Sequence, residues 1–181
     1  FCVLGIALAG MPRDAEAVVG CPPLYHNFGP FDYRSIPKES LRMVEGAHFF
    51  PNVENLRKNT PHPNRGYIVD PGNEIDYTLR AIPNHPRALM AAAKLALQYK
   101  SDRPKGLRVS IDCYFLEALE FRADDSYVPL IYGIYLAKLG KLTEAIVYFD
   151  RAKSLGDDSA NLHFNLGLAY FEAERYNEAL D

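Results

Sequence analysis

The cysteines offer the clearest chemistry in this chain, because there are only three of them: Cys2, Cys21 and Cys113. Cys2 lies in an apolar N-terminal segment that an exported protein would lose or leave in the membrane. In an oxidising compartment, the other two thiols are candidates for a disulfide that ties the N-terminal part of the chain to a later helix. The alternative is that Cys113 is a small buried side chain and Cys21 a surface thiol.

Histidine and carboxylate side chains form no recognisable catalytic or metal-binding pattern. The sequence has no HExxH, CxxC, GxSxG or phosphate-binding glycine motif. The paired carboxylates Asp124–Asp125 and Asp157–Asp158 hold matching places before two predicted helices, where aspartate serves as a cap. These patterns favour a non-enzymatic protein with no catalytic residues, no cofactor and no metal. The histidines, which share no ligand spacing, are His26, His48, His62, His85 and His163.

The composition is typical of a soluble protein. The chain has 181 residues, of which 48% are hydrophobic and 24% charged, and its net charge is -3. This charge, together with the absence of a basic cluster interleaved with aromatic residues, argues against a nucleic-acid partner. The length suits one compact domain or a short solenoid with an N-terminal extension.

The C-terminal third of the chain repeats itself with a period of 34 residues. Gly133 and Gly167 are separated by this period, and so are Ala145 and Ala179. Such a period indicates stacked pairs of helices. Small residues let two helices approach each other, and large apolar residues fill the seam. A helix predicted over 109–122 is in phase with the repeats, whereas its predicted partner over 87–99 is out of phase because the connecting loop is longer.

This repeat resembles the tetratricopeptide repeat (TPR) family. The run Asn165-Leu166-Gly167-Leu168-Ala169-Tyr170 is similar to the first helix of that repeat, and Ala145, Phe149 and Ala152 are similar to the second. The resemblance implies an all-α fold, namely a short solenoid of antiparallel helical hairpins over 74–181. The expected units are a degenerate repeat over 86–124 and repeats over 126–159 and 160–181, the last of which ends inside its second helix.

Two segments precede the repeats. Residues 1–20 are expected to be a signal peptide or a membrane anchor, and the run before Cys21 also resembles a bacterial lipobox. Any of these interpretations places the body of the protein outside the cytoplasm. Residues 21–73 are rich in proline and aromatic residues, which predicts an irregular extension with short helices over 35–46 and 51–58. We expect its aromatic rings to pack against the helical repeats.

In the TPR family, the first helices of the repeats line a concave surface that binds peptides or helices. When the lining positions of the family are transferred to this chain by its 34-residue repeat, the resulting surface is largely apolar. Such a surface favours an amphipathic helix or an extended apolar segment of a protein partner. The alternative is that the groove is filled by the chain's own aromatic extension or by helices beyond Asp181. The predicted lining is Tyr127, Leu130, Ile131, Ile134 and Lys138 in one unit, and Asn161, Phe164, Asn165, Leu168 and Glu172 in the next.

We therefore expect a non-enzymatic interaction module or scaffold of the bacterial exported or membrane-tethered type, for example an accessory subunit of a membrane-associated complex. Two other functions fit the same sequence. One is a structural subunit bound permanently inside a larger assembly through an extensive apolar interface. The other is a regulatory or substrate-binding portion of a larger enzyme that extends beyond this chain.

Overall fold

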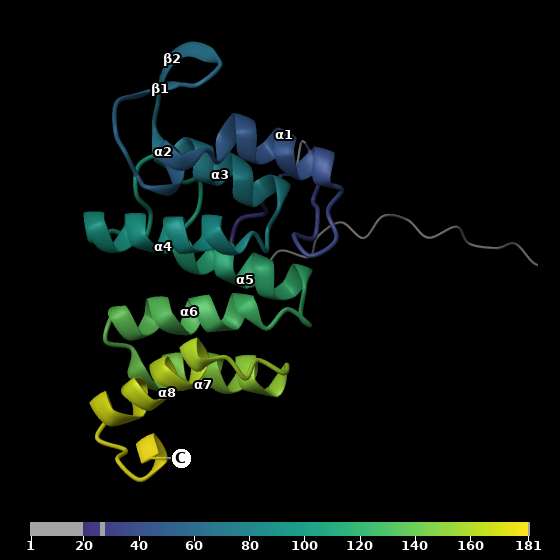
Figure 1. The fold of residues 1–181 in the computed structure, drawn as a ribbon. Coiled ribbons are helices and arrows are strands. Elements are labelled where there is room, and N and C mark those ends of the chain that lie inside the picture. The colour runs from purple at the N-terminus through teal and green to yellow at the C-terminus, as the bar shows by residue number, and fades with distance from the viewer. Residues whose placement is uncertain (1–19, 26–27, 181) are drawn as a thin grey trace, which may run out of the picture.

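The computed structural model describes residues 20–25 and 28–180, and this part of the chain is mostly helical (Figure 1). The predicted apolar segment over 1–20 therefore lies outside the described residues, apart from Gly20. Within the described part, no helix has the length and apolar character needed to cross a membrane. The α-helices are α1 (Lys38–His48), α2 (Pro51–Glu54), α3 (Pro71–Ala81), α4 (Pro86–Tyr99), α5 (Ile111–Phe121), α6 (Tyr127–Lys138), α7 (Leu142–Ser154) and α8 (Ala160–Glu172).

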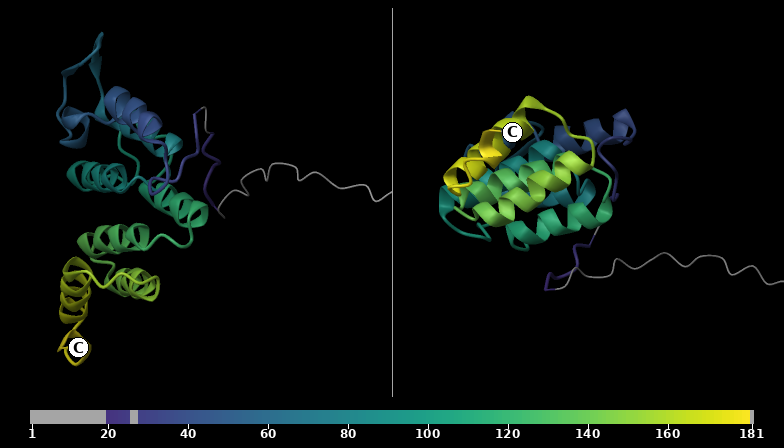
Figure 2. Two further views of the ribbon diagram at one scale, coloured as in Figure 1. Left: turned by 45° about the vertical axis from the view of Figure 1, so that its right-hand side comes forward. Right: turned by 90° about the horizontal axis from the view of Figure 1, so that it is seen from below.

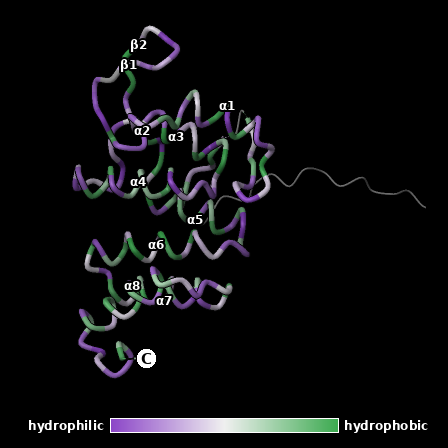
Figure 3. The backbone as a smooth tube through the Cα atoms, viewed as in Figure 1, coloured by the Kyte–Doolittle hydropathy of each residue, from purple (hydrophilic) through white to green (hydrophobic). Residues whose placement is uncertain are grey.

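The helices from α4 onward form two rows. Figure 2 (left) shows α4, α6 and α8 in one row, with α5 and α7 beside them in the other. The central helix, α6, contacts α4, α5, α7 and α8. Its hydrophobic trace in Figure 3 agrees with this position, since most of its side chains are buried. Consecutive helices are thus packed against each other throughout this part of the molecule.

In α5, α6 and α7, the residues that recur with the 34-residue period lie in the core, whereas Gly167 and Ala179 of the last unit are half-buried. Phe115 of α5 and Phe149 of α7 are fully buried, as are the alanines that follow each of them at the same spacing. Gly133 of α6 allows close packing, because a Cβ atom there would lie 2.6 Å from the Phe149 ring. The sequence prediction of a predominantly helical fold, with small residues at helix contacts, is confirmed.

The N-terminal extension contains a β-hairpin that the sequence analysis did not predict. Strand β1 (Thr60–His62) pairs antiparallel with β2 (Arg65–Val69), so the chain is not purely α-helical. Prolines on both sides of His62 concealed the strand, since proline is uncommon in sheets. The buried His62 ring secures the turn: its Nδ1 accepts the Asn64 N–H at 3.0 Å, and its Nε2 lies 2.8 Å from the Ala47 carbonyl oxygen.

Two helix ends also differ from the sequence predictions. Helix α3 begins at Pro71, before the start of the helical region expected over 74–181, because the Asp70 carboxylate accepts the Gly72 N–H at 3.0 Å and caps the helix. A side chain at Gly72 would collide with the Lys105 carbonyl oxygen, so this glycine permits contact with the loop after α4. In the last unit, the expected second helix is represented by a short 3₁₀ helix, η1 (Glu178–Leu180).

The predicted disulfide between Cys21 and Cys113 is confirmed. The two Cα atoms are 5.6 Å apart, and the bond joins residues separated by 92 positions. It links the start of the extension to α5, and close by the Arg80 guanidinium donates a hydrogen bond to the Tyr25 carbonyl oxygen at 3.2 Å. Disulfides of this kind form and persist in oxidising compartments.

Helix α4 ends with a left-handed residue that is not glycine. Lys100 has a φ of 50°. The Ser101 N–H bonds the Ala96 carbonyl oxygen at 3.1 Å, and the Lys100 N–H bonds that of Leu97 at 3.3 Å. This is the Schellman arrangement, in which glycine is preferred because other residues are strained in the left-handed region.

We predict that Lys100→Gly raises the free energy of unfolding by about 1 kcal/mol, because glycine adopts the left-handed conformation without strain. The matched control is Lys94→Gly, which places glycine inside the same helix and is expected to lower stability by about 1 kcal/mol. Urea denaturation of both variants measures the difference. A loss of stability in Lys100→Gly would contradict the assignment of strain to this residue.

We also predict that reducing the disulfide lowers the free energy of unfolding by up to about 4 kcal/mol, because closing a long loop restricts the unfolded chain. Urea denaturation with and without reductant provides the measurement. A double variant, Cys21→Ser with Cys113→Ala, serves as the control and is expected to be unaffected by reductant. A wild-type curve that does not respond to reductant would show that this bond contributes nothing.

Candidate functional site

The ten residues predicted to line a partner-binding surface all lie on α6 and α8, but they differ in exposure. Leu130 and Ile131 are buried between helices and belong to the core, so they are not available to a partner. Ile134 and Asn165 are half-buried. The exposed members of the set are Tyr127, Lys138, Asn161, Phe164, Leu168 and Glu172.

Phe164 and Tyr127 are the most exposed of the large apolar side chains in this set, at 70% and 60%. Phe164 begins an apolar strip along α8 that continues through Leu168 and Phe171. An open hollow of about 490 Å³ borders this strip, and η1 supplies its opposite wall through Ala179 and Leu180. Exposed apolar side chains are ordinary when isolated, whereas a contiguous group of them is typical of an interaction surface.

Helix α4 adds residues to this surface that sequence reasoning missed. Met90 and Lys94 are exposed on the helix, which lies in the same row as α6 and α8 (Figure 2). The longer loop after α4 puts that helix out of the 34-residue phase, so the repeat could not be used to find them. On α8, Phe171 was also missed, because its counterpart in the preceding unit is the small residue Ala137, which was not predicted to line the surface.

We give the name groove residues to a selected set of exposed and half-buried residues on α4, α6 and α8. They alternate apolar side chains with lysine and polar ones, and they come from three helices held by one core. The described groove residues are Met90, Lys94, Tyr127, Ile134, Lys138, Asn161, Phe164, Asn165, Leu168, Phe171 and Glu172.

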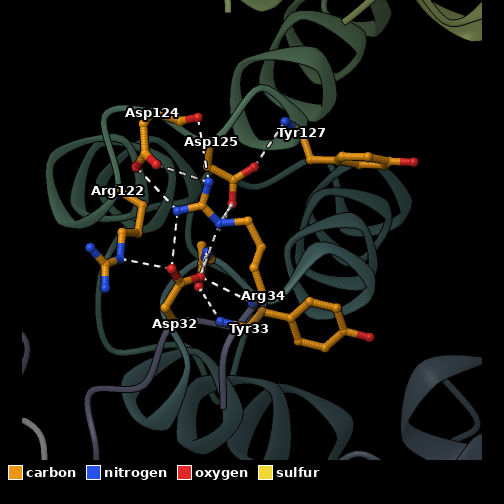
Figure 4. Close-up of polar contacts among 8 residues, drawn as sticks. Asp32, Tyr33, Arg34, Arg122, Asp124, Asp125 and Tyr127 are labelled. Atoms are coloured by element: carbon orange, nitrogen blue, oxygen red, sulfur yellow. Dashed lines mark hydrogen bonds and ion pairs between the residues drawn. The ribbon is translucent and has the colours of Figure 1, made fainter. Parts of the chain in front are cut away.

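A cluster of charged residues fastens the extension beside the N-terminal end of α6 (Figure 4). The Arg34 guanidinium lies 3.0 Å from the Asp32 carboxylate and 3.1 Å from that of Asp124. Arg122 contributes a second cation, at 2.9 Å from Asp32. Asp32 is therefore shared between two arginines from distant parts of the chain.

Asn84 connects this cluster to the turn before α4. Its side-chain amide donates hydrogen bonds to Asp32 and to Asp125, each at 2.8 Å, and its side-chain oxygen accepts the Tyr33 N–H at 2.9 Å. Asp125 in turn accepts the Tyr127 N–H at 3.0 Å. Figure 4 shows the rings of Tyr33 and Tyr127 projecting toward the same side of the cluster.

The cluster explains how the extension relates to the groove. It holds Tyr33 close to the row formed by α4, α6 and α8. There the Tyr33 ring packs against the buried His85 ring, with 4.6 Å between the two centroids. Elsewhere in the extension, Phe28 and Phe31 pack against a small cluster formed by Val44 of α1 with Ala81 and Ile82 at the end of α3. Tyr127 and Phe164 remain exposed, so the described extension does not cover them.

The electrostatics of the cluster keep Asp32 ionised. Burial disfavours its charged form, but hydrogen bonds from Arg34 and Asn84 outweigh this effect and lower the pKa of Asp32 from 3.8 to about 2. The pKa of Arg34 is raised by its hydrogen bonds to Asp32 and Asp124. A buried carboxylate that stays charged in this way requires its arginine and asparagine partners to remain in place.

Several histidine and tyrosine side chains are also paired with carboxylates. His48 Nδ1 lies 2.6 Å from Glu74 and His85 Nε2 lies 3.0 Å from Glu45, and hydrogen bonding from His85 lowers the pKa of Glu45. Burial and the neighbouring Asp76 raise the pKa of Tyr114. Within residues 20–25 and 28–180, no group of three or more histidine, cysteine or carboxylate side chains is placed to hold a metal ion.

No family model, no curated protein and no solved structure matches this chain.

We predict that Asp32→Asn lowers the free energy of unfolding at pH 7 by about 2 kcal/mol, because two arginines lose their shared carboxylate. Since the folded protein holds the pKa of Asp32 below its ordinary value, its contribution is complete above about pH 4 and is lost as the pH falls toward 2. The free energy of unfolding of the Asp32→Asn variant should therefore fall less than that of the wild type between about pH 4 and pH 2.

The control for this prediction is Asp124→Asn, which changes an exposed carboxylate of the same cluster and is expected to have little effect. Urea denaturation at pH 7 and at steps down to pH 2 gives both results. Equal stability losses in the two variants would show that Asp32 has no special role.

Proposed function

We propose that this protein is a non-enzymatic interaction module, a TPR-like solenoid whose groove residues on α4, α6 and α8 bind an amphipathic helix of a protein partner. The observation that carries the proposal is the contiguous exposure of large apolar side chains on α8, beside a core that is otherwise well packed. Phe164, Leu168 and Phe171 are all exposed there, at intervals of three and four residues. This spacing presents one face of a helix to another helix.

The rigidity of the row supports a binding role. The groove side chains project from helices whose opposite faces are locked in the core, so little backbone ordering is required when a partner binds. The charged cluster around Asp32 also restrains the extension at one end of the row. Aromatic side chains fixed in this way are frequent anchors of protein interfaces.

The chemistry of the groove defines the partner further. Lys94 and Lys138 are exposed among the apolar side chains, and neither has an ion-pair partner among the described residues. A partner helix with an apolar face flanked by acidic residues would complement both features. The proposal includes no nucleic-acid partner and no cofactor.

The proposed location is outside the cytoplasm, with the protein exported or tethered to a bacterial membrane through the segment over 1–20. The Cys21–Cys113 disulfide supports an oxidising compartment. The proposed partner is therefore another exported or membrane-associated protein, and the complex would be assembled on that side of the membrane.

Site-specific photocrosslinking in the native source tests this function. A photoreactive amino acid in place of Phe164 should join a single protein partner, whereas the same residue in place of Val147 should not. Val147 is a matched control because it is exposed to 61% but lies on α7, in the other row. Equal crosslinking from both positions, or none from Phe164, would contradict the proposed groove.

The purified crosslinked partner then permits an affinity measurement. Phe164→Ser is expected to weaken binding at least about tenfold, because truncation of an interface anchor typically costs more than about 1.4 kcal/mol. Val147→Ser should leave the dissociation constant unchanged. A partner that binds both variants equally well would have to use another surface.

A further inference from the structure

A cavity of about 430 Å³ lies apart from the groove, beside the C-terminal end of α4. Its walls come from the loop after α2, the end of β2, the start of α3, the last turns of α4 and the loop before α5. Leu95 and Tyr99 face it from α4, one turn apart, whereas the groove residues Met90 and Lys94 are exposed elsewhere on the same helix. The volume falls in the range of small-molecule sites.

The inner wall of this cavity is apolar. Leu95 and Val69 form a buried part of the lining, and Leu56 is half-buried beside them. At the mouth, Ile68 is 60% exposed and Tyr99 is 43% exposed. Apolar side chains therefore extend from the core to the opening, and an apolar occupant would cover the exposed ones.

The polar groups of the cavity differ in what they are free to bind. The Asp70 carboxylate already caps α3 through the Gly72 N–H, and the exposed Lys105 ammonium lies 3.6 Å from it. The Lys58 ammonium instead lies over the Tyr99 ring, 4.5 Å from its centroid. Within the described part of the chain, no carboxylate forms an ion pair with Lys58. Its remaining N–H donors are available to an anion at the mouth.

The loop that carries Lys58 has a strained backbone. Leu56 and Asn59 have φ values of 56° and 54°, in the left-handed region that favours glycine. Leu56 takes the glycine position of a Schellman motif: the Arg57 N–H bonds the Asn52 carbonyl oxygen at 2.8 Å, and the Leu56 N–H bonds that of Val53 at 3.0 Å. A leucine there costs backbone energy but places an apolar side chain on the cavity wall. Strain of this kind is concentrated at ligand-binding sites.

We propose that this cavity binds a small amphipathic carboxylate. Its charged group pairs with the Lys58 ammonium at the mouth, and its apolar body packs between Leu56, Leu95 and Tyr99. This function is independent of the proposed partner-binding groove, because the cavity shares no lining residue with it. The cation–π contact with the Tyr99 ring holds the Lys58 ammonium at the mouth of the cavity. A carboxylate that enters there would form a charge-assisted hydrogen bond with this ammonium.

The test uses 4-phenylbutyrate as the probe and 4-phenylbutanamide as its neutral counterpart, followed by amide chemical shifts in NMR titrations of the full chain. The carboxylate should bind saturably with a dissociation constant on the order of 1 mM, and shifts should cluster at residues 56–59, 68–70 and 95–99. The amide should bind about tenfold more weakly, because it cannot form the charge-assisted contact.

Two lysine variants complete the test. Lys58→Gln should weaken the carboxylate about tenfold without changing the amide. Lys94→Gln removes a lysine from the exposed side of α4 and should change neither. The proposal would be overturned if binding were not saturable, or if the chemical shifts changed outside the cavity. It would also be overturned if the two probes bound with equal affinity, or if the two variants had equal effects. Because both lysines are exposed, both variants are expected to keep the wild-type spectrum without probe.

Discussion

The structure depends on the close contact between α6 and its neighbours. A glycine at position 133 lets the backbone of α6 approach the ring of Phe149 so closely that no side chain would fit between them. Because α6 touches four helices at once, this contact sets the separation of the two rows. The exposed faces of α4, α6 and α8 are a consequence of this packing, since each helix has turned its other faces into the core.

A second constraint holds the extension to this framework. The disulfide fixes one point near Cys21, and the cluster around Asp32 fixes another beside the start of α6. Between these points the aromatic residues pack on α3, and the chain is tied to regions far away in sequence. Covalent and ionic links of this kind compensate for the lack of regular secondary structure in the extension.

The two proposed binding surfaces share a physical feature. In each, large apolar side chains remain exposed near a lysine that has no carboxylate partner among the described residues: Lys94 and Lys138 in the groove, and Lys58 at the cavity. The groove is open and formed by helices, which suits a macromolecular helix. The cavity is smaller and bounded by loops, which suits a small ligand. Their different shapes therefore imply different kinds of partner.

The sequence alone was enough to predict α6, α7 and α8 and the small residues at their contacts, because a regular period and local capping signals act over short distances, but it did not predict the short η1 in place of the last unit's second helix. It also identified Cys21 and Cys113 as a pair, since few other cysteines were available. It did not determine the hairpin around His62, which relies on a contact with α1. Nor did it determine the burial of Leu130 and Ile131, because a helix pattern does not reveal how many neighbours surround the helix. The charged cluster and the cavity arise only in the tertiary structure, where residues far apart in sequence come into contact, such as Arg34 and Asp124, which are 90 positions apart.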